Sequence, residues 1–229
     1  MRSIIAIVIV LLCLFPWAKD IYALLAAPLL KALPLGGTMI ATDVTGTFLV
    51  PLKVTLMAAF LIALPYVLFQ MWAFVAPGLY HHEKRLAIPV IMSSVVFFAL
   101  GMAFAYFAVF PIAFGFFANY APVGVQMMTD IDKYLSFVLT MFIAFGITFE
   151  VPVVVIVLVR LGVVSLEKLR SIRGYAIVGA FVVGAVFTPP DILSQVMLAV
   201  PLWLLYELGL LCARFITVPN RDKEGEATA

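Results

Sequence analysis

A short polar stretch between two apolar runs carries the first residues that could bind a ligand. Residues 81–85 read HHEKR and follow Pro77-Gly78, a pair that cannot continue a regular helix. Glu83 presents a carboxylate on a short, stiff loop and is therefore a candidate docking point for a cationic ligand. The alternative is a solvated ion pair of Glu83 with Lys84 or Arg85, which would contribute little to stability. The adjacent histidines point in different directions on a loop and make a poor metal site.

A second carboxylate, Glu150, lies inside an apolar run, two residues before Pro152. An ionised and unpaired carboxylate is costly within hydrocarbon, so Glu150 is expected to be protonated, hydrated or hydrogen-bonded to a neighbouring helix. Two interpretations stay open. Glu150 is either a structural polar contact or a polar anchor for a ligand or a partner helix.

Small residues recur at intervals of four along another apolar run: Ala176, Ala180, Gly184 and Thr188. Such a ladder gives a helix one smooth face, on which a second helix can approach closely. An intramolecular contact is the default interpretation. With polar Thr188 and Gln195 near its outer end, the same face could instead receive a helix from another protein.

The composition requires an apolar environment. With 66% hydrophobic residues, 11% charged residues and a mean hydropathy of +1.20, the chain has too little polar surface to cover a water-soluble globule. The net charge of +2 is too small to suggest nucleic acid as a partner. Cys13 and Cys212 lie far apart, and neither has a second ligand at metal-binding spacing. No catalytic constellation is visible, so we expect a non-enzymatic protein of the lipid bilayer without a metal or cofactor.

Long continuous apolar runs predict an all-α integral membrane bundle of six helices, some kinked and some short. The predicted spans are residues 4–18, 48–75, 86–118, 134–159, 174–187 and 192–213. The third run is too long for one straight span, and we expect it to tilt or to kink at Pro111. Residues 19–47 are predicted as an ordered outer loop with a short amphipathic helix over 21–33. Residues 1–215 form a single domain, and residues 216–229 are expected to be a disordered tail.

The distribution of basic residues orients these spans. Ten lysines and arginines fall on one side of the predicted topology and three on the other. Because basic residues concentrate in cytoplasmic loops, both termini are expected to lie in the cytoplasm. No internal repeat supports the inverted-repeat architecture of many transporters.

Several motifs, taken in order, resemble the TatC family, the multi-spanning subunit of the bacterial twin-arginine protein translocase. They are WAFVAPGLY at 72–80 with HEKR at 82–85, GMAFAY at 101–106, FEVP at 149–152 and TPPD at 188–191. The resemblance covers essentially the whole chain. It implies a receptor in the bacterial cytoplasmic (inner) membrane that binds twin-arginine signal peptides of folded cargo and assembles with TatB and TatA. It also implies self-association in the receptor complex and transport driven by the proton-motive force.

The resemblance also implies roles for individual residues. Glu83 would contact the arginines of the signal, with Phe74, Lys84 and Arg85 shaping that surface. Glu150 would be the intramembrane polar residue of a concave face. A partner-helix site would consist of Thr188, Gln195 and Gly184. Pro28 and Asp191 would be structural or assembly positions in outer loops. The family's N-terminal cytoplasmic helix, close to H-L-x-E-L-R-x-R, is not found before the first predicted span, which fits the shortness of that span. We expect either that the true start lies further upstream or that this version binds signal peptides weakly.

The rival hypothesis is a proton-coupled transporter of small solutes or ions that uses Glu150. Spans interrupted by proline fit this alternative. A transporter normally needs an enclosed polar path, however, and one buried carboxylate is too little to form it. An intramembrane protease is a third possibility, and it lacks a Ser/His or paired-Asp arrangement within the spans.

Overall fold

Nearly every described residue of the computed structural model is helical. The structure describes residues 2–32, 39–75, 87–119, 128–160, 162–188 and 191–215. The helices are α1 (Arg2–Leu14), η1 (Phe15–Trp17, a 3-10 turn), α2 (Ala18–Ala32), α3 (Gly46–Val75), α4 (Ala87–Phe104), η4 (Ala105–Val109, a π turn), α5 (Phe110–Asn119), α6 (Ile131–Arg160), α7 (Leu166–Ser171), α8 (Arg173–Phe187) and α9 (Ile192–Arg214). The all-α prediction is confirmed for these residues.

Five helical stretches in the described part of the chain are long and apolar enough to cross a bilayer. They are Arg2–Ala27, Gly46–Gln70, Ile88–Asn119, Ile131–Arg160 and Ile192–Arg214. Helix α8 is apolar but shorter, with 15 residues. At about 1.5 Å per residue it reaches roughly 22 Å, less than the roughly 30 Å of a hydrocarbon core. By length and composition, the described helices therefore give five candidate spans and one shorter apolar helix.

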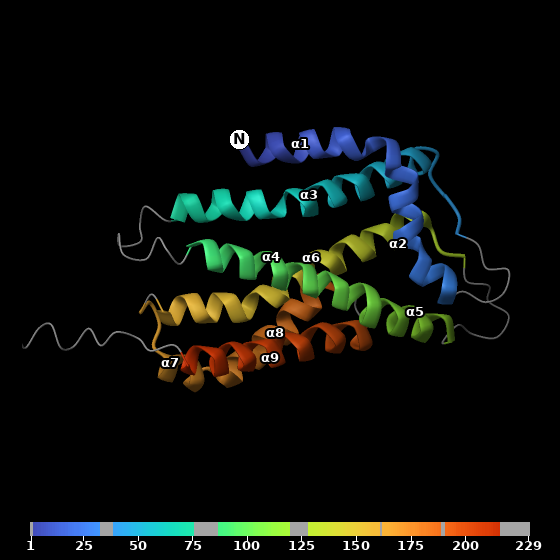
Figure 1. Cartoon of the computed structure of the whole chain (residues 1–229). Helices are drawn as coiled ribbons and strands as arrows, with labels where there is room; N and C mark the ends of the chain where they lie inside the picture. Colours follow the sequence, from blue (N-terminus) through green and yellow to red (C-terminus); the bar gives the residue numbers. More distant parts are fainter. Residues whose placement is uncertain are drawn as a thin grey trace, which may run out of the picture.

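The helix at the first predicted span has different bounds in the structure. We expected one helix over residues 4–18, but α1 ends at Leu14 and η1 turns the chain into α2, which crosses the bundle (Figure 1). Pro16 lies inside this turn and has no N–H for a regular helical bond. The predicted amphipathic helix over 21–33 corresponds to α2, which begins at Ala18. The other predicted boundaries lie within about three residues of the observed ones.

The long third run contains a π turn directly before Pro111. Helices α4 and α5 are joined by η4, where the Phe110 N–H bonds to the carbonyl of Ala105. Pro111 follows directly and cannot donate to the carbonyl four residues earlier. The wider turn therefore lies where the regular hydrogen-bond ladder is interrupted.

Helix α6 is the centre of the bundle. It packs against α4 on one side and against α9 on the other (Figure 1). Its Leu135, Met141 and Phe145 are fully buried, as is Phe110 of α5. Burial of these side chains removes them from lipid and fixes the positions of the helices that carry the candidate sites.

Two glycines bring α4 and α6 into close contact. A Cβ on Gly101 of α4 would lie 2.9 Å from the carbonyl carbon of Phe145 and 3.0 Å from the Cβ of Phe149. A Cβ on Gly146 of α6 would lie 2.6 Å from the ring of Phe98 on α4. Real Cβ atoms do not come this close to their neighbours, so the crossing depends on these two missing side chains.

The helix ends divide between two ends of the bundle. Helix α1 begins, α3 ends, α4 begins and α9 ends at the same end, which also carries α7 (Figure 1). Helix α2 and the start of α6 lie at the opposite end. The connection between α3 and α4 therefore joins the bundle at the end where the described chain begins and finishes.

Candidate functional site

Polar contacts at the α2 end of the bundle join two segments that are far apart in sequence. Ile40 forms an isolated parallel bridge with Asp130. Its N–H donates to the carbonyl of Thr129 at 3.0 Å, and its carbonyl accepts from the N–H of Ile131 at 2.9 Å. We call Ile40, Thr42, Asp43, Lys53, Asp130 and Asp132 the outer brace. No pattern in the sequence predicted this feature.

Asp130 is the central residue of the outer brace. Its Oδ2 accepts from the hydroxyl of Thr42 and, at 3.0 Å, from the Thr42 N–H. Its Oδ1 accepts from the N–H groups of Asp132 at 2.9 Å and Lys133 at 3.1 Å, as an N-cap of α6 does. These bonds, led by the Thr42 hydroxyl, lower the pKa of Asp130 to about 2. An Asp directly before an apolar helix was the sequence signal for this cap.

The remaining contacts of the outer brace join α3 to α6 and stabilise the turn before α3. Lys53 Nζ lies 2.5 Å from Asp132 Oδ1. The hydroxyl of Thr45 donates to Asp43 Oδ2 at 2.7 Å and its N–H donates to Oδ1 at 3.2 Å, which lowers the pKa of Asp43. Asp43 thus stabilises the turn that leads into α3.

The low pKa of Asp130 predicts how acid weakens the brace. Because the folded pKa of about 2 is below the ordinary 3.8, the carboxylate stabilises the fold fully above pH 3.8, and this is lost as the pH falls toward 2. Asp130→Asn should lower the thermal unfolding midpoint at pH 7, and the gap to the unmodified chain should shrink between about pH 4 and pH 2. Thermal unfolding in detergent at several pH values measures both effects.

The matched control for this prediction is Asp20→Asn, which removes an exposed carboxylate of α2 outside the outer brace. It should leave the neutral-pH midpoint unchanged. A constant gap between Asp130→Asn and the unmodified chain down to pH 2 would contradict the role given to the Asp130 carboxylate.

The small-residue ladder faces α9. Ala180, Gly184 and Thr188 are buried, and a Cβ on Gly184 would lie 3.0 Å from the carbonyl oxygen of Gln195. The side chains on the opposite side of α8 are exposed: Tyr175 is 80% exposed and Val186 is 73% exposed. The sequence left two interpretations of this ladder open, an intramolecular contact and a site for a helix from another protein. The structure shows the intramolecular contact.

Thr188 and Gln195 lie together at the α8–α9 turn. The hydroxyl and the N–H of Thr188 both donate to the carbonyl of Gly184, at 2.8 and 2.9 Å. The Gln195 amide donates to the carbonyl of Phe181 at 3.1 Å, which ties α9 back to α8. Gln195 is partly exposed and could exchange this bond for one to an approaching helix.

Asp191 is the N-cap of α9. Its Oδ1 accepts from the N–H of Ser194 at 2.7 Å. Its Oδ2 and the Ser194 hydroxyl are buried without a partner among the described residues. The observed contact of Asp191 is therefore structural, because it starts α9 directly after the turn.

Pro28 lies in helix α2, which corresponds to the helix predicted over residues 21–33 of the outer-loop region. A proline cannot donate to the carbonyl four residues earlier, which here belongs to Leu24. That carbonyl accepts instead from the hydroxyl of Tyr106 in η4 at 2.8 Å. The next carbonyl, of Leu25, accepts from the hydroxyl of Tyr134 in α6 at 2.6 Å. These two tyrosines fasten α2 across the end of the bundle.

Glu150 is half-buried in α6. Its polar neighbour is Ser94 of α4, whose side chain interacts with the carboxylate and is 4% exposed. Its Oε1 is buried and has no hydrogen-bond partner in the described part of the chain. The arrangement leaves a hydrogen-bonding atom between α4 and α6 that a further donor could satisfy.

The predicted ligand-binding residues at the other end are described only in part. Glu83, Lys84 and Arg85 lie outside the described residues, and Phe74 lies in the last turn of α3 with its side chain outside them. Near the same end, Arg173 pairs with Glu207 at 2.8 Å and the Tyr206 hydroxyl donates to the carbonyl of Leu169 at 2.8 Å. Within the described ranges, no group of three or more His, Cys, Asp or Glu residues could hold a metal ion.

This protein is a multi-pass helical membrane protein. This class follows from its long apolar helices, the exposed apolar side chains around them and the polar residues at their ends. Residues 1–201 match the family described as Sec-independent protein translocase protein (TatC). The chain belongs to this TatC family, whose members are non-enzymatic transport proteins of the inner membrane.

Individual relatives support this assignment. The chain is 52% identical over 224 residues to the Sec-independent protein translocase protein TatC of Escherichia coli (strain K12), which covers 98% of this chain and 87% of the relative. It is 58% identical over 210 residues to the protein of the same description from Azotobacter chroococcum mcd 1, covering 92% and 82%. A crystal structure described as "Twin Arginine Translocase Receptor- TatC" superposes with a TM-score of 0.81 at 41% identity, covering 93% of each chain. Membership of a protein-translocase family favours protein transport over the solute transporter that the sequence left as an alternative.

Proposed function

We propose that this protein is the signal-peptide receptor and core subunit of a twin-arginine translocase, which exports folded proteins using the proton-motive force. In this proposal the chain spans the membrane six times, with α8 as the short fifth span and both termini in the cytoplasm. The proposal rests on the family membership and on the similarity to a crystallised protein that is described as a twin-arginine translocase receptor.

The observation that supports the proposal is where the helices on either side of the Glu83 segment end and begin. Helix α3 ends at Val75 and α4 begins at Ala87, at the end of the bundle where α1 begins and α9 ends (Figure 1). The same end carries Arg160, Lys168, Arg170 and Arg214, which fits a cytoplasmic face. In this proposal, a signal peptide that arrives from the cytoplasm meets the segment between α3 and α4, which contains Glu83.

The chemistry of a twin-arginine signal suits a carboxylate at this position. A guanidinium group donates two parallel hydrogen bonds to one carboxylate, and this geometry discriminates arginine from lysine. Glu83 satisfies one such group, while Phe74, Lys84 and Arg85 shape the surface around it. A second guanidinium needs a further acceptor.

Within the membrane, Glu150 and the α8–α9 turn are proposed to serve partner helices. The unsatisfied Oε1 of Glu150 can accept a bond from a polar residue of an inserted helix. Gln195 can release the carbonyl of Phe181 to bond a second helix beside Thr188. The proposed partners are the single-span TatB and TatA subunits, with further copies of this chain in the receptor complex.

The test of the proposal is signal-peptide binding by the full chain in detergent or nanodiscs. Glu83→Ala should weaken binding of a twin-arginine peptide by about tenfold or more, because a hydrogen bond to a charged group contributes about 1.5–3 kcal/mol. Fluorescence anisotropy with a labelled peptide measures this change, and export of a folded reporter measures its consequence.

Two controls make this experiment specific. Glu167→Ala removes an exposed carboxylate of α7 at the same end of the bundle and should leave binding unchanged. A twin-lysine peptide should bind weakly and respond little to Glu83→Ala. Unchanged binding and export in Glu83→Ala would show that Glu83 does not contact the signal.

A further inference from the structure

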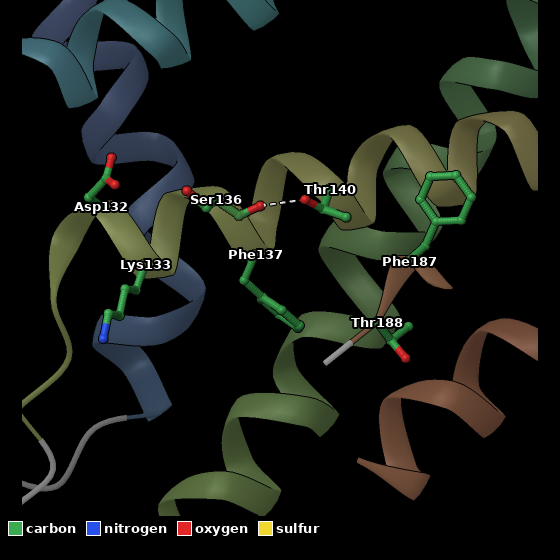
Figure 2. Close-up of a pocket in the computed structure, with 7 residues that line it drawn as sticks. All are labelled: Asp132, Lys133, Ser136, Phe137, Thr140, Phe187 and Thr188. Atoms are coloured by element: carbon green, nitrogen blue, oxygen red, sulfur yellow. Dashed lines mark hydrogen bonds between the residues drawn. The ribbon is translucent and has the colours of Figure 1, made fainter. Parts of the chain in front are cut away.

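A cavity lies between α6 and the α8–α9 turn. Its volume is about 400 Å³, and Figure 2 shows Phe137 of α6 on one wall and Phe187 and Thr188 on the other. The other lining residues on its α6 side are Asp132, Lys133, Ser136 and Thr140. None of the roles assigned above uses Lys133, Ser136 or Phe137.

The polarity of the cavity changes along α6. Lys133 lies at the start of the helix; Ser136 follows about 4.5 Å further along the axis and Thr140 about 10 Å, at about 1.5 Å per residue. Beyond them, the same exposed face continues with apolar Ile143 and Ile147. The order is thus a cation, then hydroxyl groups, then hydrocarbon, which is the order of phosphate, ester and acyl groups in a phospholipid.

The hydrogen bonds and ion pairs of the outer brace leave Lys133 and Ser136 available. Lys53 occupies Oδ1 of Asp132, and the Lys133 backbone N–H occupies Asp130. In the ranges that the structure describes, the Lys133 ammonium has no carboxylate within ion-pair distance, and the Ser136 hydroxyl has no partner. Thr140 already donates its hydroxyl to the carbonyl of Ser136 at 2.7 Å.

We infer that this cavity binds one zwitterionic glycerophospholipid whose headgroup ends in a primary ammonium, as in phosphatidylethanolamine. Lys133 holds the lipid phosphate and Ser136 donates to an ester carbonyl. One acyl chain lies between Phe137 and Phe187 and continues along Ile147. Asp132, which also lines the cavity and is partly exposed, accepts from the lipid ammonium with its second oxygen.

The balance of charge at the rim favours this headgroup. Asp132 and Asp130 lie beside Lys133, so a purely anionic headgroup meets carboxylates as well as one cation. A zwitterionic headgroup can pair its phosphate with the cation and its ammonium with a carboxylate. The proposed lipid site does not depend on the orientation of the chain in the membrane or on cargo binding.

The experiment is native mass spectrometry of the full, delipidated chain with added phosphatidylethanolamine, phosphatidylcholine or phosphatidylglycerol. We expect one tightly bound phosphatidylethanolamine. Lys133→Gln should weaken it about tenfold, and Ser136→Ala about threefold. Lys133→Arg should retain binding, because it preserves the cation.

The matched control is Lys19→Gln, which removes an exposed lysine of α2 that does not line the cavity. It should leave lipid binding unchanged, and equal thermal midpoints show that all variants are folded.

Equal losses of lipid binding in Lys133→Gln and Lys19→Gln would overturn the site. Equal or tighter binding of phosphatidylglycerol would overturn the headgroup assignment. If Lys133→Gln reduced co-purification of a single-span partner without changing lipid binding, the occupant would be a helix and the lipid proposal would be wrong. A failed Glu83→Ala test would leave these lipid measurements unaffected.

Discussion

Gly101→Ala is expected to destabilise the bundle by about 3 kcal/mol, at the upper end of the usual cost of overpacking. The new methyl group would meet the backbone carbonyl of Phe145, which cannot move unless α6 moves with it. Since α6 is the central helix, its displacement affects α4, α9 and the surroundings of Glu150. The thermal unfolding midpoint in detergent should fall by roughly 6–12 °C.

Gly115→Ala is the matched control for this substitution. Gly115 lies in α5, and no atom lies within 4 Å of the position its Cβ would take. Alanine favours a helix over glycine by up to about 1 kcal/mol, so this variant should be neutral or slightly more stable. If both variants shifted the midpoint equally, the close α4–α6 crossing would not exist in the protein.

Gly184→Leu is expected to separate the ends of α8 and α9 and to lower stability by about 2–3 kcal/mol, a typical cost of overpacking. Its Cβ would lie 3.0 Å from the carbonyl oxygen of Gln195 and 3.1 Å from the Gln195 Cγ, and the rest of the leucine side chain needs more space. The bond from the Gln195 amide to the carbonyl of Phe181 should break as well. Because this turn carries the proposed partner-helix site, crosslinking to a TatB helix should also decrease.

The comparison for Gly184→Leu is Gly179→Leu in the same helix. Gly179 has no atom within 4 Å of its Cβ position and is exposed, so leucine there should leave the thermal midpoint unchanged. A lowered midpoint in Gly184→Leu with unchanged crosslinking would mean that the ladder serves internal packing alone. An unchanged midpoint would contradict the observed α8–α9 contact.

The membrane environment, the helices and the family could all be predicted from the residues alone. Long apolar runs can cross a bilayer only as helices here, because every backbone polar group must be paired within lipid. Most helix boundaries were therefore predictable from where these runs end. The motifs around Glu83, Glu150 and Thr188 indicated the TatC family, and the similarity to known members confirms that membership.

Which distant residues contact one another became clear only from the folded chain. Thr42 and Asp130 are 88 positions apart, and no local pattern indicates that the two segments pair in the outer brace. Gly101 and Gly115 look equivalent in the sequence, yet one lies against a neighbouring backbone and the other faces open space. Pro28 lies within the helix predicted over residues 21–33, but only the structure shows that a tyrosine from η4 donates to the carbonyl that the proline cannot bond. The physical reason is common to all three: the propensity to form a helix is local, whereas the packing of one helix against another depends on contacts between distant parts of the chain.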